Sequence, residues 1–374
     1  MKIGITCYPT YGGSGTVATE LGHELAKRGH QVHFISYSLP YRLNVYDENI
    51  FFHEVTLMAY PLFEYPPYSL ALAAKMAEVA EREDLDLLHV HYAIPHAVCA
   101  FLAKQLLGTE QLKVITTLHG TDITLVGNDT SFYSITKWSL EQSDGVTAVS
   151  HSLRDETVRH FCCEDEITVI PNFVDTQHFR RDRVQAERTH FARRTEKIIC
   201  HISNFRPVKR VGDVIRVFSR IQSEVPAKLL LIGDGPDRSL AQSLSQELNI
   251  SDRVMFLGRQ ESVAELLAIS DLLLLPSEKE SFGLAALEAM SCQVPVIASK
   301  TGGLPELISH GETGFLAAVG DVAAMARFGV QILSDDALRE NLGTHGRQRV
   351  LKQFTTDYVV PMYEDLYREM IGRS

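Results

Sequence analysis

A pair of carboxylates, Glu280 and Glu288, stands out in the segment EKESFGLAALEAM at positions 278–290. The preceding run, DLLLLPS at 271–277, predicts a parallel strand that is covered on both faces. A helix is expected to start near Gly283, which puts Glu280 in the strand-to-helix loop and Glu288 one turn inside the helix. Both side chains would then point into the crevice where open α/β sheets bind ligands. Carboxylates in that place can accept hydrogen bonds from the hydroxyl groups of a ligand.

A glycine-rich stretch follows the first predicted strand, within PTYGGSGTVATELGHEL at 9–25. Its backbone amides lie at the start of a helix, where the helix dipole favours an anion, so we expect a cradle for a phosphate or a carboxylate. A dinucleotide site is disfavoured because the spacing is not GxGxxG and no acidic residue closes the second strand, QVHFISYS. A plain structural turn is the other alternative. The residues concerned are Gly12, Gly13, Ser14 and Gly15.

A cluster of basic and amide side chains follows the first strand of the second half, in SNFRPVKRVGD at 203–213. An ammonium and a guanidinium placed before a helix can neutralise a diphosphate. The alternative is a solvated basic loop. The cluster consists of Asn204, Arg206, Lys209 and Arg210. Glycine turns follow two further strands, in IGDGPDR at 232–238 and TGGLPELISHGETGFL at 301–316, and their position at strand ends makes them informative.

Four histidines occur near predicted strand ends, in HVHYAIPHA and TTLHGTD: His89, His91, His96 and His119. A zinc site needs three converging ligands, and His89 and His91, which share one strand face, supply only two. Hydrogen-bonded or substrate-binding histidines are therefore the favoured interpretation, and no metal is expected. The GxSxG elbow and the GxxxxGK[ST] loop are missing, which disfavours a serine hydrolase and a P-loop ATPase.

The elements that must carry these residues alternate between short β-rich runs and amphipathic stretches, as in right-handed βαβ units on a parallel sheet. The candidate strands are KIGITCY, QVHFISY, DLLHVH, LKVITTLHG, GVTAVS and EITVIPN in the first half, and KIICHISN, AKLLLIGDG, RVMFLG, DLLLLPS and PVIASK in the second. Between the halves, IPNFVDTQHFRRDR at 170–183 breaks the alternation and is the best linker candidate. We therefore expect an α/β protein of two doubly wound, Rossmann-like parallel-sheet domains facing a central cleft.

The length of 374 residues also favours two domains, because one ordinary core does not grow to that size. The expected boundaries are 1–170 for the N-terminal domain and 171–354 for the C-terminal domain, with a final helix at 355–374. This helix contains Pro361, which predicts a kink. Its tyrosine and methionine residues have helical spacing, and we expect them to pack back onto the first domain.

The formal net charge of −11 disfavours nucleic acid or an anionic membrane as the main partner. No apolar run approaches the roughly 20 residues that span a bilayer, and the N-terminus lacks the features of a signal peptide, so we expect a cytoplasmic protein. The cysteines form no CxxC pair, which favours reduced, buried thiols. They are Cys7, Cys99, Cys162, Cys163, Cys200 and Cys292.

Taken together, the sequence resembles the GT-B glycosyltransferases of family four. The blocks that carry the resemblance are ESFGLAALE at 280–288, GDGP at 233–236, FLGR at 256–259, LLLLPS and HGETGFL, and they span essentially the whole chain. The resemblance implies a retaining, UDP-sugar-dependent hexosyltransferase of GT-B fold that uses no metal and no other cofactor. It further implies that the N-terminal domain binds the acceptor and the C-terminal domain binds the donor.

Over the first half the match looks narrower. IGITCYPTYGGSGTVATELG, HVHYAIPHA and TTLHGTDIT resemble the family members that join N-acetylglucosamine to L-malate in bacillithiol biosynthesis. This implies UDP-GlcNAc and L-malate as substrates, with neither nucleic acid nor membrane as a partner; the oligomeric state stays open, a homo-oligomer included. The rivals are a family-four transferase for an inositol phosphate or a lipid, a UDP-sugar epimerase of the same fold and a non-catalytic UDP-sugar sensor.

The resemblance also implies roles for single residues. Glu288 would accept from the ribose hydroxyls of the donor, and Glu280 from hydroxyls of the donor sugar. The donor-binding set is Gly13, Ser14, Asn204, Lys209, Gly233, Arg259, Glu280, Phe282, Gly283, Leu284 and Glu288, and the catalytic set is Lys209, Arg206, Glu280 and His119. Relatives usually carry an arginine where this chain has Asn204, and Arg206 is the candidate replacement for its charge.

The two carboxylates of malate need hydrogen-bond donors from the first domain. The candidates are Ser14, Arg42, Tyr92, Thr117 and Arg154. No nucleophile stands out in the sequence, which favours front-face transfer, in which the leaving diphosphate oxygen takes the proton of the acceptor. Catalysis would then rest on positioning and on the stabilisation of charge.

Overall fold

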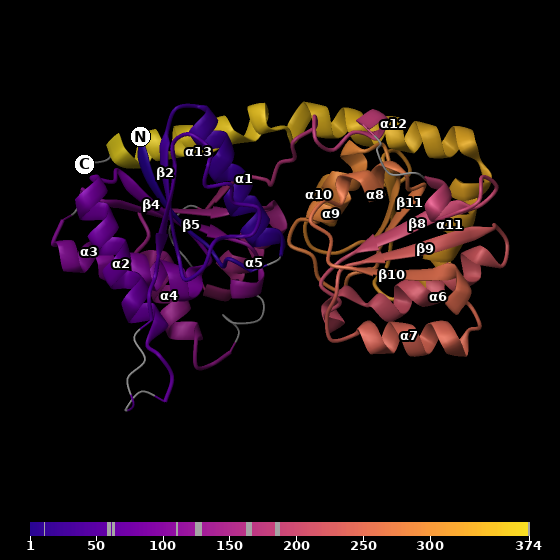
Figure 1. Ribbon diagram of the computed structural model, residues 1–374, viewed down its shortest axis with the longest axis horizontal. Coiled ribbons are helices and arrows are strands. Elements are labelled where there is room, and N and C mark those ends of the chain that lie inside the picture. The colour runs from indigo at the N-terminus through magenta and orange to yellow at the C-terminus, as the bar shows by residue number, and fades with distance from the viewer. Residues whose placement is uncertain are drawn as a thin grey trace. The chain divides into compact units, whose positions relative to one another are not determined.

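The computed structural model describes residues 1–10, 12–57, 61, 64–109, 111–123, 129–161, 167–183 and 188–372 (Figure 1). Contacts within the chain divide it into two compact units. The first unit consists of Met1–Asn172 together with Asp357–Ser374, and the second of Phe173–Thr356.

The first unit contains a seven-stranded sheet in which all strands are parallel, in the order β3-β2-β1-β4-β5-β6-β7. Its strands are β1 (Lys2–Thr6), β2 (Gln31–Ser36), β3 (Ile50–Glu54), β4 (Leu87–His91), β5 (Lys113–Leu118), β6 (Gly145–Ala148) and β7 (Ile167–Val169). Its helices are α1 (Gly13–Lys27), α2 (Tyr68–Glu83), α3 (Val98–Leu107), α4 (Tyr133–Glu141) and α5 (His151–Phe161). The sequence order reverses about β1, so the sheet is doubly wound.

The second unit contains a six-stranded parallel sheet in the order β10-β9-β8-β11-β12-β13. Its strands are β8 (Lys197–Ile202), β9 (Ala227–Ile232), β10 (Val254–Gly258), β11 (Leu272–Leu275), β12 (Val296–Ser299) and β13 (Gly314–Ala317). Its helices are α6 (Val211–Gln222), α7 (Arg238–Glu247), α8 (Ala264–Ala268), α9 (Leu284–Ser291), α10 (Leu304–Leu307), α11 (Val322–Ser334) and α12 (Asp336–Gln353). The prediction of two doubly wound parallel sheets is confirmed.

One strand of the first unit, β3, was not among the strands that the sequence predicted. It lies at the sheet edge, pairs with β2 alone and has the sequence IFFHE, of which only Ile50 is buried. An edge strand needs no continuous apolar run, because one side of it faces no other strand. The pattern used for the buried strands therefore does not detect it.

The last helix, α13 (Thr356–Gly372), belongs to the first unit from Asp357 onward. The hydroxyl of Tyr367 lies 2.7 Å from Nδ1 of His89 on β4, and Oε1 of Glu364 lies 2.8 Å from Nε2 of His30. Pro361 lies inside this helix. These contacts attach the C-terminal end of the chain to the first sheet.

The described cysteines are Cys7, Cys99, Cys200 and Cys292, and all four are buried free thiols. Burial raises the pKa of the Cys7 thiol to about 12, so it stays protonated at neutral pH. The prediction of reduced, buried thiols is confirmed for these four; Cys162 and Cys163 lie outside the described residues. Within the described ranges, no helix combines the length and the apolar character that crossing a membrane requires.

Candidate functional site

Loops at the carboxyl edge of the second sheet are held against each other through glycines. A Cβ added to Gly302, after β12, would lie 1.9 Å from the carbonyl oxygen of Glu280, after β11. A Cβ added to Gly233, after β9, would lie 1.8 Å from the carbonyl oxygen of Ser203, after β8. Both glycines also have positive φ, of 53° and 120°. A larger residue is therefore excluded both by the close contact and by the backbone conformation. The glycine turns therefore serve to bring neighbouring loops into backbone contact.

Lys209 and Glu280 meet at this edge. Lys209 ends a single 3-10 turn, Pro207–Lys209, and its Nζ lies 2.6 Å from Oε2 of Glu280. The same carboxylate oxygen accepts a hydrogen bond of 3.1 Å from the hydroxyl of Ser277. Both side chains of the ion pair are largely buried, with exposed fractions of 21% and 15%. The pair is held in one geometry while the ammonium keeps further N–H donors for a ligand.

Helix α9 begins directly behind this ion pair. Gly283 occupies its N-cap position with φ of 102°, and Leu284 is the first helical residue. The first amides of a helix have no intrahelical acceptor, so the backbone N–H groups of Phe282, Gly283 and Leu284 are suited to bind an anion. Glu288 follows Leu284 by one helical turn and is 7% exposed. The carboxylates thus occupy the predicted places, one in the loop and one in the helix.

The loop after β8 places the basic cluster. Arg210 is used within the fold, because its Nε donates to Asp213 over 2.7 Å and its NH1 lies 3.5 Å from Glu278. Arg206 is exposed, whereas Asn204 is half-buried and its Oδ1 has no hydrogen-bond partner within the described part of the chain. In this loop, Lys209 is therefore the cation that forms an ion pair with another predicted site residue, Glu280.

A buried histidine that the sequence did not single out supports this loop. Nδ1 of His201 lies 2.8 Å from the carbonyl oxygen of Leu274, and its Nε2 lies 2.8 Å from the hydroxyl of Ser203. That hydroxyl accepts from the N–H of Phe205, whose φ is 41°. Burial lowers the pKa of His201 to about 4, so the ring is neutral at pH 7. A histidine inside a strand gives no sequence signal for such a role, because only the fold brings the carbonyl oxygen of Leu274, on the neighbouring strand β11, to it.

Two remaining donor-side candidates lie at the same sheet edge. Arg259 is exposed and directly follows β10. The N–H of Gly233 donates to the carbonyl oxygen of Gly258 over 2.8 Å, which joins the ends of β9 and β10. The second unit therefore brings together, at one edge, the donor-side residues that the sequence placed in it.

In the first unit, the glycine-rich loop contacts the loop after β4. The hydroxyl of Tyr92 donates to Oγ of Ser14 over 2.9 Å. Gly13 is the first residue of α1, and Gly12 is its N-cap. Tyr92 has φ of 94°, which is rare for a residue with a side chain. Two predicted site residues, Ser14 and Tyr92, are thus neighbours in the fold.

The predicted histidines form pairs with one another and with hydroxyls. Nδ1 of His91 lies 2.8 Å from Nε2 of His119, and the two rings stack at 5.1 Å. Burial lowers the pKa of His119 to about 3 and that of His91 well below 6.5, so both rings are neutral at pH 7. Nε2 of His89 lies 2.6 Å from Oγ1 of Thr117. A neutral His119 can donate or accept a hydrogen bond without carrying a charge.

The acceptor-side candidates differ in their surroundings. Thr117 is fully buried, and its hydroxyl also bonds to Thr147 over 2.7 Å, so it joins neighbouring strands. The guanidinium of Arg42 lies 5.4 Å from the centre of the Tyr41 ring, and the Arg42 side chain is 20% exposed. Arg154 donates to Asp155 through Nε and NH2, over 2.9 and 2.7 Å. The malate-binding role of these residues stays a prediction.

A different group of possible metal ligands occurs among the described residues, formed by His33, His53 and Glu83, whose ligand atoms lie within 4.8 Å of one another. Arg82 donates to Nδ1 of His53 over 3.2 Å and to Oε1 of Glu83 over 2.8 Å. Nδ1 of His33 lies 3.0 Å from Nε2 of His53. The guanidinium of Arg82 thus already donates to the carboxylate of Glu83 and to the ring of His53. We therefore interpret the group as a hydrogen-bonded network.

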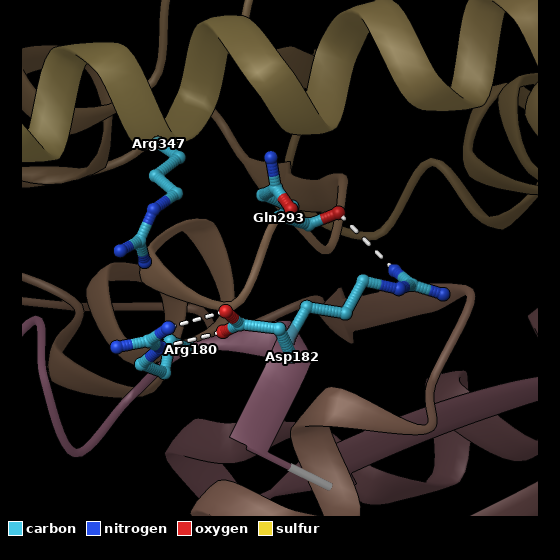
Figure 2. A pocket seen from close by; sticks show the side chains of 5 residues that line it. Arg180, Asp182, Gln293 and Arg347 are labelled. Atoms are coloured by element: carbon cyan, nitrogen blue, oxygen red, sulfur yellow. Dashed lines mark hydrogen bonds and ion pairs between the residues drawn. The ribbon is translucent and has the colours of Figure 1, made fainter.

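A cavity of about 400 Å³ in the second unit is lined by Arg180, Arg181, Asp182, Gln293 and Arg347 (Figure 2). Arg347 reaches from α12 and donates to the carbonyl oxygens of Phe179 and Ser291, the latter being the last residue of α9. Figure 2 shows Arg180 facing Asp182, with which it forms two hydrogen bonds. These guanidiniums are therefore engaged by carbonyl oxygens and by a carboxylate, and Arg347 ties the C-terminal end of α9 to the segment that contains Phe179.

Comparisons with known proteins assign both halves of the chain. The family model described as glycosyl transferases group 1 matches residues 182–349, and the model described as glycosyltransferase family 4 matches residues 11–178. N-acetyl-alpha-D-glucosaminyl L-malate synthase of Bacillus anthracis is 55% identical over 372 residues, which make up 99% of this chain and 97% of that protein.

Solved structures share the architecture. Sucrose-phosphate synthase from Thermosynechococcus elongatus gives a TM-score of 0.81 at 25% identity, with 100% of both chains covered. Anabaena HepE in complex with UDP-glucose gives a TM-score of 0.83 at 19% identity, with 99% of this chain and 100% of that chain covered. At 19% identity the second likeness concerns the fold alone.

Proposed function

The chain belongs to the family-four glycosyltransferases, and we propose that it transfers N-acetylglucosamine from UDP-GlcNAc to the hydroxyl of L-malate. The products are GlcNAc-malate and UDP, and the transfer is the first step of bacillithiol biosynthesis. The observation that carries the proposal is the 55% identity, over almost the whole of both chains, to the N-acetyl-alpha-D-glucosaminyl L-malate synthase of Bacillus anthracis. The expected place of the reaction is the cytoplasm.

The donor half of the reaction is assigned to the second unit. Glu288, buried on α9, accepts from the ribose hydroxyls, and Glu280 accepts from hydroxyls of the sugar. The diphosphate lies against the first amides of α9, where the helix dipole adds to the charge of Lys209. The ion pair of 2.6 Å supports this assignment because it fixes the ammonium beside the loop that reads the sugar. Asn204, Gly233 and Arg259 are the outer members of the set.

The acceptor half is assigned to the first unit. Ser14, joined to Tyr92, lies at the N-terminal end of α1, where a carboxylate of malate is stabilised by free amides. The neutral ring of His119 is suited to a hydroxyl of the donor sugar, since a charged ring would instead bind the diphosphate. Arg42, Thr117 and Arg154 complete the proposed set.

The proposed chemistry is front-face transfer with retention. The bond between the anomeric carbon and the diphosphate oxygen breaks, malate attacks from the same face, and the leaving oxygen takes the hydroxyl proton of malate. Lys209, Arg206 and the α9 amides stabilise the charge that develops on UDP. No metal ion or other cofactor takes part in this proposal, so activity should survive an excess of EDTA.

One assay separates the candidate functions: release of UDP from UDP-GlcNAc, measured with and without L-malate. The proposal requires release that depends on malate and a GlcNAc-malate product in equal amount. Release with an inositol phosphate or a lipid, but none with malate, would assign another acceptor. Consumption of donor without any acceptor would indicate an epimerase, and binding without release would indicate a sensor.

A further inference from the structure

Two loops of the first unit carry side chains of the proposed site, Tyr92 on the acceptor side and His119 for a hydroxyl of the donor sugar. The loop after β4 begins with Tyr92, and the loop after β5 begins with His119. Tyr92 has φ of 94°, and a side-chain-bearing residue keeps such a conformation only where its surroundings enforce it. One tie is the hydrogen bond of 3.0 Å from its N–H to the carbonyl oxygen of Thr117. The backbone N–H groups of the next residue in each loop, Ala93 and Gly120, also require hydrogen-bond acceptors.

The carboxylate of Asp122 supplies that partner for both loops. Its Oδ2 accepts from the N–H of Ala93 over 3.2 Å, and its Oδ1 accepts from the N–H of Gly120 over 2.9 Å. Ala93 directly follows Tyr92, and Gly120 directly follows His119. A single side chain therefore fixes the backbone next to both residues.

The burial of Asp122 is costly to the fold. The residue is 1% exposed, and within the described ranges neither lysine nor arginine forms an ion pair with it. Burial raises the pKa of its carboxyl group to about 6, although several backbone N–H groups favour the ionised form. The titratable groups that face it are the phenols of Tyr8 and Tyr92. A buried carboxylate with no cation beside it stabilises a fold poorly, so its presence calls for another reason.

We propose that Asp122 is a positioning residue for the acceptor, whose carboxylate clamps the two loops so that Tyr92 and His119 are presented in one geometry. The inference rests on the proposed function. Asp122 touches no substrate in this account. It acts through the backbone of its two neighbours, and a displacement of about 1 Å at a reacting group is enough to reduce catalysis strongly.

The test replaces Asp122 with asparagine and measures KM for L-malate, kcat and the Kd of UDP at pH 8. An asparagine amide has one oxygen acceptor and one NH2 donor. The NH2 group would face one of the two backbone N–H donors, so one of the two hydrogen bonds is lost. We expect KM for malate to rise about tenfold or more, with the Kd of UDP changed less than twofold. The matched control is Asp144→Asn, because Asp144 also accepts a backbone N–H, that of Val114 over 2.8 Å, at the opposite end of β5. This control should leave KM for malate unchanged.

The pH dependence gives a readout that a purely structural role would not move. In the native protein, Asp122 protonates as the pH falls through about 6 and then resembles the amide. The ratio of native to Asp122→Asn kcat/KM for malate should therefore fall from tenfold or more at pH 8 to less than about threefold at pH 5. Titration of malate itself cancels in this ratio.

Any one of three results overturns the inference. They are an unchanged KM for malate in Asp122→Asn, an equal rise of this KM in Asp144→Asn, or a ratio of native to Asp122→Asn kcat/KM that does not vary with pH. If Asp122→Asn does not fold, Asp122→Glu keeps the charge and lengthens the side chain by one methylene, and the same rise in KM is required of it. Native protein that transfers nothing to malate would overturn the proposed function itself, which is a different outcome.

Discussion

The ammonium of Lys209 and the carboxylate of Glu280 form an ion pair of 2.6 Å between loops that are 71 residues apart in the chain. Both side chains are mostly shielded from water, so the attraction is stronger than in an exposed pair. A glycine after β12 fixes the carbonyl of Glu280, and a 3-10 turn fixes Lys209. The geometry that we assign to the diphosphate and the sugar is therefore in place in the second unit by itself.

Replacing Lys209 with alanine should cost roughly 2–5 kcal/mol in transition-state stabilisation, because one partner of a shielded charge pair is lost and Glu280 is left unpaired. The measurement is kcat/KM for UDP-GlcNAc. Lys228→Ala is the control, since Lys228 donates to the carbonyl oxygen of Asp252 and lies in an exposed contact. Native turnover in Lys209→Ala would refute the assigned role.

Replacing Glu288 with glutamine should weaken UDP binding by about ten- to a hundredfold, because a carboxylate accepts from hydroxyls more strongly than an amide does. Replacing Glu280 with glutamine should instead lower kcat and leave UDP affinity within about threefold, because its assigned partner is the sugar. Isothermal titration with UDP separates the two variants. Equal losses of UDP affinity in both would show that the division between ribose and sugar is wrong.

Replacing Arg42 with alanine should raise KM for L-malate by about tenfold, as expected for the loss of a charged partner of a carboxylate, while the Kd of UDP stays the same. Arg368→Ala is the control, because Arg368 lies on α13 in an ion pair of 2.7 Å with Asp365. The comparison is made by initial rates at fixed UDP-GlcNAc. A fall in UDP affinity would contradict the placement of Arg42 on the acceptor side.

Replacing Gly302 with alanine should reduce both stability and UDP affinity, because the new methyl would stand 1.9 Å from the carbonyl oxygen of Glu280. Gly311→Ala is the matched control: Gly311 also has positive φ, of 82°, but nothing lies within 4 Å of an added Cβ. In the control, the free energy of unfolding should fall only by the cost of the backbone conformation, about 1 kcal/mol. Chemical denaturation and UDP titration of the two variants provide the test; equal effects would refute the role of close packing.

Stability should fall as the pH drops from 6.5. Burial lowers the pKa of His89 to about 3 and that of His96 to about 4, both below the 6.5 of an exposed histidine. Between these values the unfolded chain binds more protons than the folded chain, so acid favours unfolding and the stabilisation is complete only above pH 6.5. Thermal melts at pH 7.5 and 5 should show this loss, and the loss should shrink in His89→Asn. The raised pKa of Asp122 makes the folded chain bind more protons in acid, which acts in the opposite direction. One carboxyl group does not cancel the effect of two histidines on stability.

Alternating apolar runs predicted both sheets, because a strand buried on two faces must be apolar along its length. The same reasoning missed both β3, whose sequence IFFHE is mostly accessible at the edge of the first sheet, and β13, a buried strand of four residues at the edge of the second. Residue type and position after a strand were enough to name Lys209, Glu280 and Glu288. They were not enough to name Asp122 or His201, because the fold alone brings to them the N–H of Ala93 and the carbonyl oxygen of Leu274.

The sequence by itself determined the architecture and the family, since hydrophobic periodicity and motif spacing are properties of the chain as written. Only the tertiary structure decided which groups meet. Parallel crossovers bring the carboxyl ends of distant strands to one edge of each sheet: Lys209 lies beside Glu280 in the second unit, and Tyr92 lies beside Ser14 in the first. It also decided which histidines are neutral, because the pKa of a side chain depends on the water and the charges around it, and burial sets both.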